Sequence, residues 1–195
     1  MKVSIFPREN YLTKLRPFYK SADLIKVVTG IRRCGKSSLL LSVMAELQGQ
    51  GIDSCDIIYL NLDAYGYTSV RTPEQLERLI SAATTDDHFK YLFVDEIQNV
   101  EGFETLLNAY RESERFSIFI TGSNSYLLSG ELVTKLTGRY IEVPIFPVSF
   151  FLILHKSFLQ LAVDKAQHAV YNGSTASSLV HIHIRRFPCP HPMRS

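Results

Sequence analysis

The sequence has no tryptophan, few cysteines, little net charge and no long apolar run. Its 195 residues carry a net charge of +2, which is too small to indicate a nucleic acid or an acidic membrane as the partner. The three cysteines lie far apart and form no C-x-x-C pair. This spacing does not fit a disulfide framework and favours a reducing cytoplasm.

Membrane segments are also missing from the pattern. The N-terminus, "MKVSIFPREN", lacks the apolar core of a signal peptide. The most apolar stretch, residues 145–163, is interrupted by Pro147, His155 and Lys156. It is shorter than the ~20 continuous apolar residues of a spanning helix. We therefore expect a soluble cytoplasmic protein with no membrane partner.

Short β-type runs alternate with helical patterns over the first 150 residues. Strands are predicted at 24–30, 57–63, 91–96, 116–123 and 139–146, and helices at 37–49, 72–83 and 102–112. Strands separated by helices are typical of a parallel sheet covered on both faces, so the fold class is α/β. The predicted organisation is a lead-in segment (1–22), a main α/β domain (23–150) and an atypical tail (151–195).

Two helix ends carry recognisable signals. Thr72 is the expected N-cap of its helix, with Pro73 at the first helical position and Gln75 closing a capping box. Gly49 is the expected C-cap of the first long helix.

Residues 151–195 differ in composition from the rest of the chain. They contain five of the six histidines and one acidic residue, Asp164. One interpretation is a peripheral helix followed by disorder. The alternatives are a metal site using His181, His183 and His191, or a tail that arises from a frameshift or truncation.

A glycine-framed basic loop follows the first predicted strand. Residues 30–37 match G-x-x-x-x-G-K-[ST] at each fixed position, between a strand and a helix as the mechanism of that motif requires. Backbone N–H groups and the helix N-terminus would hold phosphates there, with Lys36 on the β- and γ-phosphates and Ser37 as a Mg²⁺ ligand. The alternative is an ordinary strand-to-helix turn. The predicted ATP-binding residues are Gly30, Ile31, Arg32, Arg33, Cys34, Gly35, Lys36, Ser37 and Ser38.

The stretch "YLFVDEIQ" supplies two carboxylates at the end of a buried strand. Asp95 is the predicted second Mg²⁺ ligand, acting through water, and Glu96 the predicted general base. An acid directly after the Asp favours a hydrolase over a kinase. The chain has no N-K-x-D motif for reading guanine, so ATP is the preferred nucleotide.

Hydrolases with an Asp-Glu strand end usually insert the fourth strand between the first and the third. This predicts the sheet order 5-1-4-3-2. The polar residues at the end of that strand, Thr121, Ser123 and Asn124, would then lie beside the γ-phosphate, and Ser123 or Asn124 is the predicted sensor. The alternative is a plain polar turn.

Arg139 stands just before the fifth predicted strand. It is either a solvated charge or an arginine finger, acting on its own site or on a neighbouring copy in a homo-oligomer. Arg32 and Arg33 would add positive potential at the loop. Cys34 is either an oxidisable residue beside the phosphates or a small filler.

Taken together, these blocks resemble a family of prokaryotic ATPases of the AAA superfamily. The resemblance covers residues 8–150 and lies in the blocks "RENYLTKLRPF", "IKVVTGIRRCGKSSLL", "YLNLD", "LFVDEIQNVEGFE", "ITGSNSYLLSGEL" and "LTGRYIEVPIFPVSF". It implies the roles given above for Lys36, Ser37, Asp95 and Glu96, and an ATPase-linked role for Arg139. Members of that family continue into a C-terminal domain of unknown function, from which this chain departs after residue 150.

The sequence therefore favours a Mg²⁺-dependent ATPase. Two hypotheses remain beside it. One is a nucleotide-binding switch or remnant with little turnover. The other is a DNA-associated ATPase module, which no basic stripe or recognition motif supports.

Overall fold

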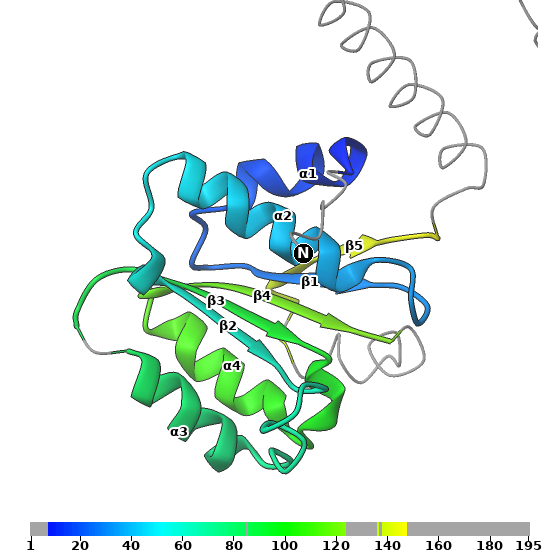
Figure 1. Ribbon diagram of the computed structural model, residues 1–195. Helices are drawn as coiled ribbons and strands as arrows, with labels where there is room; N and C mark the ends of the chain where they lie inside the picture. The colour runs from blue at the N-terminus through cyan, green and yellow to red at the C-terminus, as the bar shows by residue number, and fades with distance from the viewer. Residues whose placement is uncertain (1–7, 85, 124–135, 137, 148–195) are drawn as a thin grey trace, which may run out of the picture. The chain divides into compact units, whose positions relative to one another are not determined.

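The computed structural model describes residues 8–84, 86–123, 136 and 138–147, all within the unit Met1–Val148. Five parallel strands form one sheet in the order β2-β3-β4-β1-β5, which confirms the predicted order. The strands are β1 (Ile25–Thr29), β2 (Ile57–Asn61), β3 (Lys90–Asp95), β4 (Phe116–Gly122) and β5 (Tyr140–Pro144). Their carboxyl ends point toward the loop that follows β1 (Figure 1).

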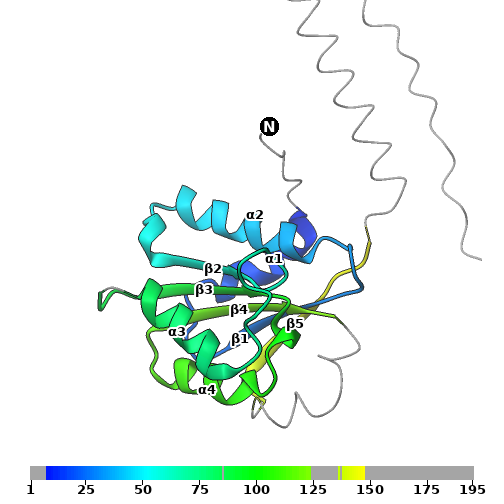
Figure 2. The same cartoon turned by 60° about the horizontal axis from the view of Figure 1, so that its bottom comes forward.

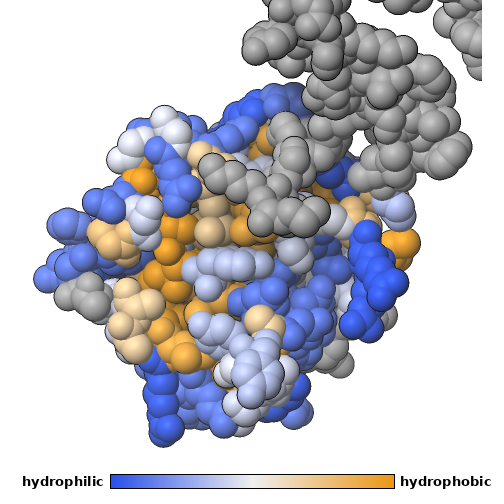
Figure 3. Space-filling model, viewed as in Figure 1, coloured by the Kyte–Doolittle hydropathy of each residue, from blue (hydrophilic) through white to orange (hydrophobic). Residues whose placement is uncertain are grey.

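Burial along each strand follows its place in the sheet. Every residue of β1, β3 and β4 is buried, as expected for central strands covered on both faces. In the edge strand β2, buried Ile58 and Leu60 pack into the cluster on the α3–α4 face, and the alternating residues Ile57 and Tyr59 are half-buried on the other face. Apolar side chains reach the surface in the part of the molecule where β2 runs between α2 and α3 (Figures 1 and 3).

Helices cover both faces of the sheet, as predicted. On one face lie α1 (Glu9–Leu15) and α2 (Lys36–Gly49), and on the other lie α3 (Pro73–Ala83) and α4 (Phe103–Glu112), as Figures 1 and 2 show. Each pair buries its own apolar cluster against the sheet. Leu12 and Leu40 belong to the first cluster and Leu76 and Leu107 to the second, all fully buried.

Of the two predicted helix ends, one is confirmed and one is displaced. Thr72 caps α3 in a complete capping box with Gln75. Gly49, the predicted C-cap of α2, lies inside the helix, and Gln50 is the C-cap. The left-handed position is taken two residues later by Gly51, with φ +87°. Gly49 and Gly51 are both glycines near the end of the helix, and only the backbone path of the turn decides which of them takes the left-handed conformation.

The lead-in segment is part of the layered structure. Leu12 and Leu15 of α1 are fully buried in the cluster shared with α2. The guanidinium of Arg16, in the short 3₁₀ helix Arg16–Phe18, binds Glu46 of α2 through Nε at 3.0 Å and Nη2 at 2.7 Å. The first 3₁₀ turn therefore docks on the same helix that begins at the phosphate loop.

A lysine is buried in the middle of the sheet, which the sequence reasoning did not anticipate. Lys26 of β1 is fully buried, and its Nζ donates to the carbonyl of Ser21 at 2.6 Å and to Ser117 Oγ at 2.8 Å. It also lies over the ring of Phe119, 4.7 Å from the centroid. Desolvation lowers the pKa of this amine to about 7.

Two further predictions concern a membrane span and a metal site in the tail. Among the described residues, no helix combines the length and apolar character needed to cross a bilayer. The histidines proposed for a metal site (His181, His183 and His191) lie outside the described residues.

Candidate functional site

The loop between β1 and α2 is shaped by two glycines. A Cβ on Gly30 would come within 2.6 Å of the carbonyl oxygen of Ile145 and 2.5 Å of Cys34 Sγ, so only glycine fits. Gly35 has φ +98° and is the N-cap of α2. L-residues with a side chain rarely adopt this conformation. Both glycines of the motif therefore have a structural reason to be glycine.

The intervening residues divide into exposed and buried ones. Ile31, Arg32 and Arg33 are exposed, and Arg33 takes a left-handed conformation with φ +64°. Cys34 is 2% exposed and packs against Gly30. This packing fits the small-filler interpretation of Cys34.

Lys36 is the first residue of α2, and its side chain turns into the site. It is 4% exposed, although lysine is almost never buried without a partner. Its Nζ donates to the carbonyl of Gly30 at 3.2 Å and lies 3.4 Å from Glu96 Oε1. The amine is thus held at the mouth of the loop, between the loop backbone and the end of β3.

Asp95 ends β3 and is 1% exposed. Both carboxylate oxygens are hydrogen-bonded. The Thr121 hydroxyl, from β4, donates to Oδ1, and the Tyr59 hydroxyl, from β2, donates to Oδ2 at 3.2 Å. Burial, followed by the Asp95 charge, raises the pKa of Tyr59. Asp95 is therefore oriented by side chains from both neighbouring strands.

Glu96 follows β3 in a left-handed conformation, with φ +58° and ψ +49°. Its backbone N–H donates to Thr121 Oγ1 at 3.0 Å, so the same hydroxyl fixes both carboxylate residues. Gln98 Nε2 donates to Glu96 Oε2 at 2.5 Å, while Lys36 faces Oε1. The backbone conformation turns the Glu96 side chain out of the β3 alternation and toward Lys36.

Ser37, Ser38 and Ser123 are predicted site residues that follow the loop or β4. Ser37 is half-buried in the first turn of α2, and Ser38 beside it is exposed. Ser123 directly follows β4 and is half-buried. Asn124 lies outside the described residues, so the choice between the two sensors stays a prediction.

Arg139 lies at the opposite edge of the sheet. Its carbonyl accepts the N–H of Ile25, where β1 begins, and its side chain is exposed. From Ile25 the chain runs five residues to Gly30, about 16 Å at ~3.3 Å per residue. The guanidinium cannot reach the loop of its own subunit, because this distance exceeds the length of an arginine side chain. Any arginine-finger role is thus restricted to a neighbouring copy and stays a prediction.

Three residues with contacts at the site were not singled out as functional by the sequence reasoning: Tyr59, Gln98 and Arg8. Tyr59 lies in the "YLNLD" block and Gln98 two residues after Glu96, so both blocks contained a signal that the motif roles left unused. Arg8 Nη1 donates to the carbonyl of Cys34 at 2.9 Å. The two residues are 26 positions apart, and no local pattern links them.

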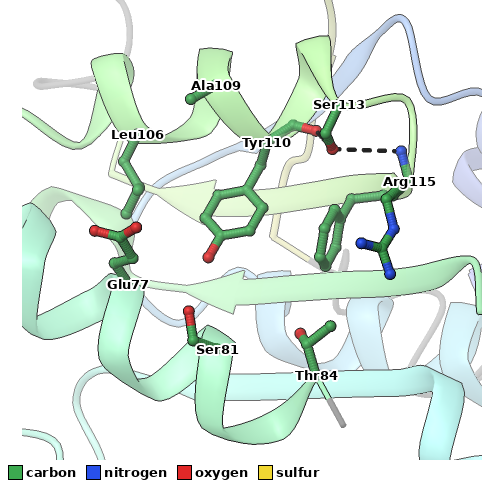
Figure 4. Close-up of a pocket in the computed structure, with 9 residues that line it drawn as sticks. Glu77, Ser81, Thr84, Leu106, Ala109, Tyr110, Ser113 and Arg115 are labelled. Atoms are coloured by element: carbon green, nitrogen blue, oxygen red, sulfur yellow. Dashed lines mark hydrogen bonds between the residues drawn. The ribbon is translucent and has the colours of Figure 1, made fainter. Parts of the chain in front are cut away.

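A pocket of about 390 Å³ lies elsewhere, between α3 and α4 (Figure 4). Glu77 and Ser81 of α3 face Leu106 and Tyr110 of α4 across it. Phe116, where β4 begins, also lines it. None of the predicted nucleotide-site residues lines this pocket.

The chain matches a known protein family over residues 22–154, and this family is described as AAA domain. The chain belongs to the AAA-domain family. The five-stranded sheet is accordingly that of an AAA-superfamily P-loop ATPase.

Two relatives of this AAA domain are described as uncharacterized proteins. One, from Haemophilus influenzae, is 46% identical over 156 residues, covering 80% of this chain and 39% of the relative. The other, from Methanocaldococcus jannaschii, is 36% identical over 126 residues, covering 65% of this chain and 27% of the relative. The chain thus spans less than half of the length of either relative.

Two solved structures share the fold at low sequence identity. A DNA polymerase III gamma subunit-related protein from Thermotoga maritima has a TM-score of 0.53 at 13% identity, covering 72% of this chain and 47% of that one. A DNA replication initiation factor has a TM-score of 0.52 at 19% identity, covering 78% and 49%. At these identities the likeness concerns the fold alone.

Proposed function

We propose that this AAA domain binds ATP at the loop 30–38 and hydrolyses it to ADP and phosphate. One observation carries the proposal: Lys36 Nζ lies 3.4 Å from Glu96 Oε1, with the buried Asp95 directly before Glu96. A phosphate-binding amine and a candidate general base thus meet at the carboxyl edge of the sheet. This is the edge where α/β sheets bind ligands.

The loop suits a chain of phosphates. Gly30 leaves no room for a Cβ, so the backbone itself forms the wall of the loop. Gly35 is the N-cap of α2, a helix of 14 residues whose N-terminal N–H groups have no partner within the helix. Such a terminus favours anions through both its free donors and its dipole.

The side-chain oxygen atoms near the loop also suit Mg²⁺, which prefers oxygen ligands and retains several waters. The Ser37 hydroxyl and the Asp95 carboxylate would hold the ion, the latter through water. When bound, Mg²⁺ neutralises negative charge on the β- and γ-phosphate oxygens. Both Asp95 oxygens already accept hydrogen bonds from neighbouring strands, which fits contact through water better than direct coordination.

In the proposed reaction a water attacks the γ-phosphorus in line with the bridging oxygen. A bond forms from the water oxygen to phosphorus, the bond to the bridging oxygen breaks, and ADP leaves. Glu96 orients the water and accepts its proton. Lys36 stabilises negative charge on the transferring group. Thr121 keeps both carboxylate residues in register through its contacts with Asp95 and the Glu96 backbone.

The contacts of Glu96 also bear on the second candidate function, a nucleotide-binding switch with little turnover. Lys36 and Gln98 each contact one oxygen of Glu96. Each carboxylate oxygen can still accept a hydrogen bond from a water, and bound phosphates would compete with Oε1 for Lys36. A Glu96 carboxylate that stays paired with Lys36 when ATP binds would favour the switch.

Phosphate release by the purified full chain tests the proposal. ATP with Mg²⁺ should be hydrolysed, GTP should be a poorer substrate, and chelation of Mg²⁺ should abolish turnover. ATP binding without phosphate release would favour the switch. Absence of binding would refute both functions.

Two further roles stay predictions. Arg139 would act only across a contact between copies of the chain. This predicts that the turnover rate per chain rises with protein concentration. DNA association has no support from the net charge of +2. Strongly salt-dependent binding of duplex DNA would revive it.

A further inference from the structure

Arg8, from the lead-in segment, connects the phosphate loop to the chain leaving β5. Its Nη1 donates to the carbonyl of Cys34 at 2.9 Å, and its Nη2 donates to the carbonyl of Phe146 at 2.6 Å. The guanidinium also lies over the Tyr11 ring, with Cζ 4.4 Å from the centroid. One side chain thus contacts three segments that are distant in sequence.

The junction around Arg8 is fixed on its other sides. The backbone N–H of Phe146 donates to the Tyr11 hydroxyl at 3.2 Å. The N–H of Ile145 donates to the carbonyl of Thr29 at 2.7 Å, directly before the loop. Arg8 is therefore held between α1 and the end of β5, so its contact with Cys34 is made by a positioned guanidinium.

The Cys34 carbonyl belongs to a peptide whose orientation matters for phosphate binding. In a planar trans peptide, the C=O of one residue and the N–H of the next point in opposite directions. By holding the Cys34 carbonyl on one side, Arg8 keeps the Gly35 N–H on the other. Gly35, directly after this bond, has φ +98°, and Arg33, one residue before Cys34, has φ +64°. Glycine resists rotation of such a peptide least.

We propose that Arg8 is a positioning residue of the nucleotide site, which orients the Cys34–Gly35 peptide so that the Gly35 N–H faces the phosphates. The proposal rests on the proposed function of the loop. It assigns to the lead-in segment a direct effect on phosphate affinity. It also places positive charge beside the loop, since the Cβ position of Gly35 lies 3.7 Å from Arg8 Nη1.

Calorimetric titration of the full chain with Mg²⁺–ADP and with Mg²⁺–pyrophosphate tests this role. Arg8→Ala should raise the Kd of both probes about ten-fold, the effect of losing one hydrogen bond to a charged group. Arg8→Lys keeps the charge but not the two-pronged contact, and should raise both values roughly three-fold. Lys14→Ala is the matched control: Lys14 is exposed, lies on the helix that Arg8 caps, and its Nζ is 5.9 Å from the centroid of the Tyr11 ring. It should change neither Kd more than about two-fold.

The outcomes separate the rival roles. Wild-type affinity for pyrophosphate in Arg8→Ala overturns the proposal, whether or not the variant unfolds at a lower temperature. If Arg8→Ala does not fold, Arg8→Lys decides in the same way. A loss confined to ADP would place Arg8 on the base instead, and an equal loss in Lys14→Ala would reduce the effect to general charge. Wild-type protein that binds neither probe would refute the proposed function itself.

Discussion

Replacing Glu96 by glutamine should separate nucleotide binding from turnover. The substitution keeps the size of the side chain and its contact with Gln98, but removes the charge that faces Lys36. As the proposed general base, Glu96 accounts for a factor of about 100 or more in rate, so phosphate release should fall at least that far. Binding should move in the other direction.

The magnitude of the binding change follows from the ion pair. At 3.4 Å between Lys36 Nζ and Glu96 Oε1, and with an effective dielectric constant of ~20, the attraction is at most about 5 kcal/mol. Glu96 is 19% exposed, and Lys36 exchanges one anionic partner for another when phosphates bind. We therefore expect about 1–2 kcal/mol to be released when the pair is removed, or roughly 5- to 30-fold tighter ATP binding.

Titration calorimetry with Mg²⁺–ATP and a phosphate-release assay measure the two effects on the same preparation. Glu101→Gln is the matched control, because Glu101 is an exposed carboxylate five residues further along the chain. It should leave both quantities within about two-fold of wild type. Turnover retained in Glu96→Gln would refute the general-base role, and weaker ATP binding would refute the competition between Glu96 and phosphate for Lys36.

Three further predictions concern Gly30, Lys26 and Gln98. Gly30→Ala should abolish nucleotide binding and lower the unfolding temperature, because its Cβ would collide with the carbonyl of Ile145 at 2.6 Å. Unchanged nucleotide binding would contradict the proposed role of the loop 30–38 in holding phosphates. The pKa of Lys26 is lowered to about 7, whereas that of an unfolded chain stays near 10.5, so the unfolded state binds more protons between these values and stability should rise with pH across that window. Urea unfolding of wild type and Lys26→Met should then show a difference in unfolding free energy that changes by up to about 1.4 kcal/mol per pH unit between pH 7 and 9, and a constant difference would rule this out. Gln98→Leu should lower kcat more than it changes the Kd for ATP, since Gln98 donates to Glu96 Oε2, and a wild-type pH–rate profile with wild-type kcat would show that the contact is only structural.

The sheet order was predictable, and the candidate site residues could be named, because each had a local signal. The strands were recognised from apolar runs, and their order from the acid that follows Asp95. Phosphate-loop residues are set by backbone geometry that few sequences satisfy, as the space around Gly30 illustrates. The capping box of α3 uses residues three apart, so its signal lies within one window.

The supporting contacts could not be predicted, because they join residues that are far apart in the chain. Arg8 binds the carbonyl of Phe146, 138 residues away, and Tyr59 reaches Asp95 from a neighbouring strand. Arg139 shows the same limit. Its sequence context suggested an arginine finger. Only the pairing of β1 with β5 shows that Arg139 lies where these strands begin, at the edge away from the loop 30–38 of its own subunit.

The most direct test of the central claim compares wild type with Lys36→Ala for Mg²⁺–ATP binding and for phosphate release. Lys20→Ala, which removes an exposed lysine, serves as the control, and circular dichroism checks that all three proteins are folded. The account predicts binding and turnover in wild type and in Lys20→Ala, and loss of both in folded Lys36→Ala. Equal binding and equal turnover in wild type and Lys36→Ala would contradict it.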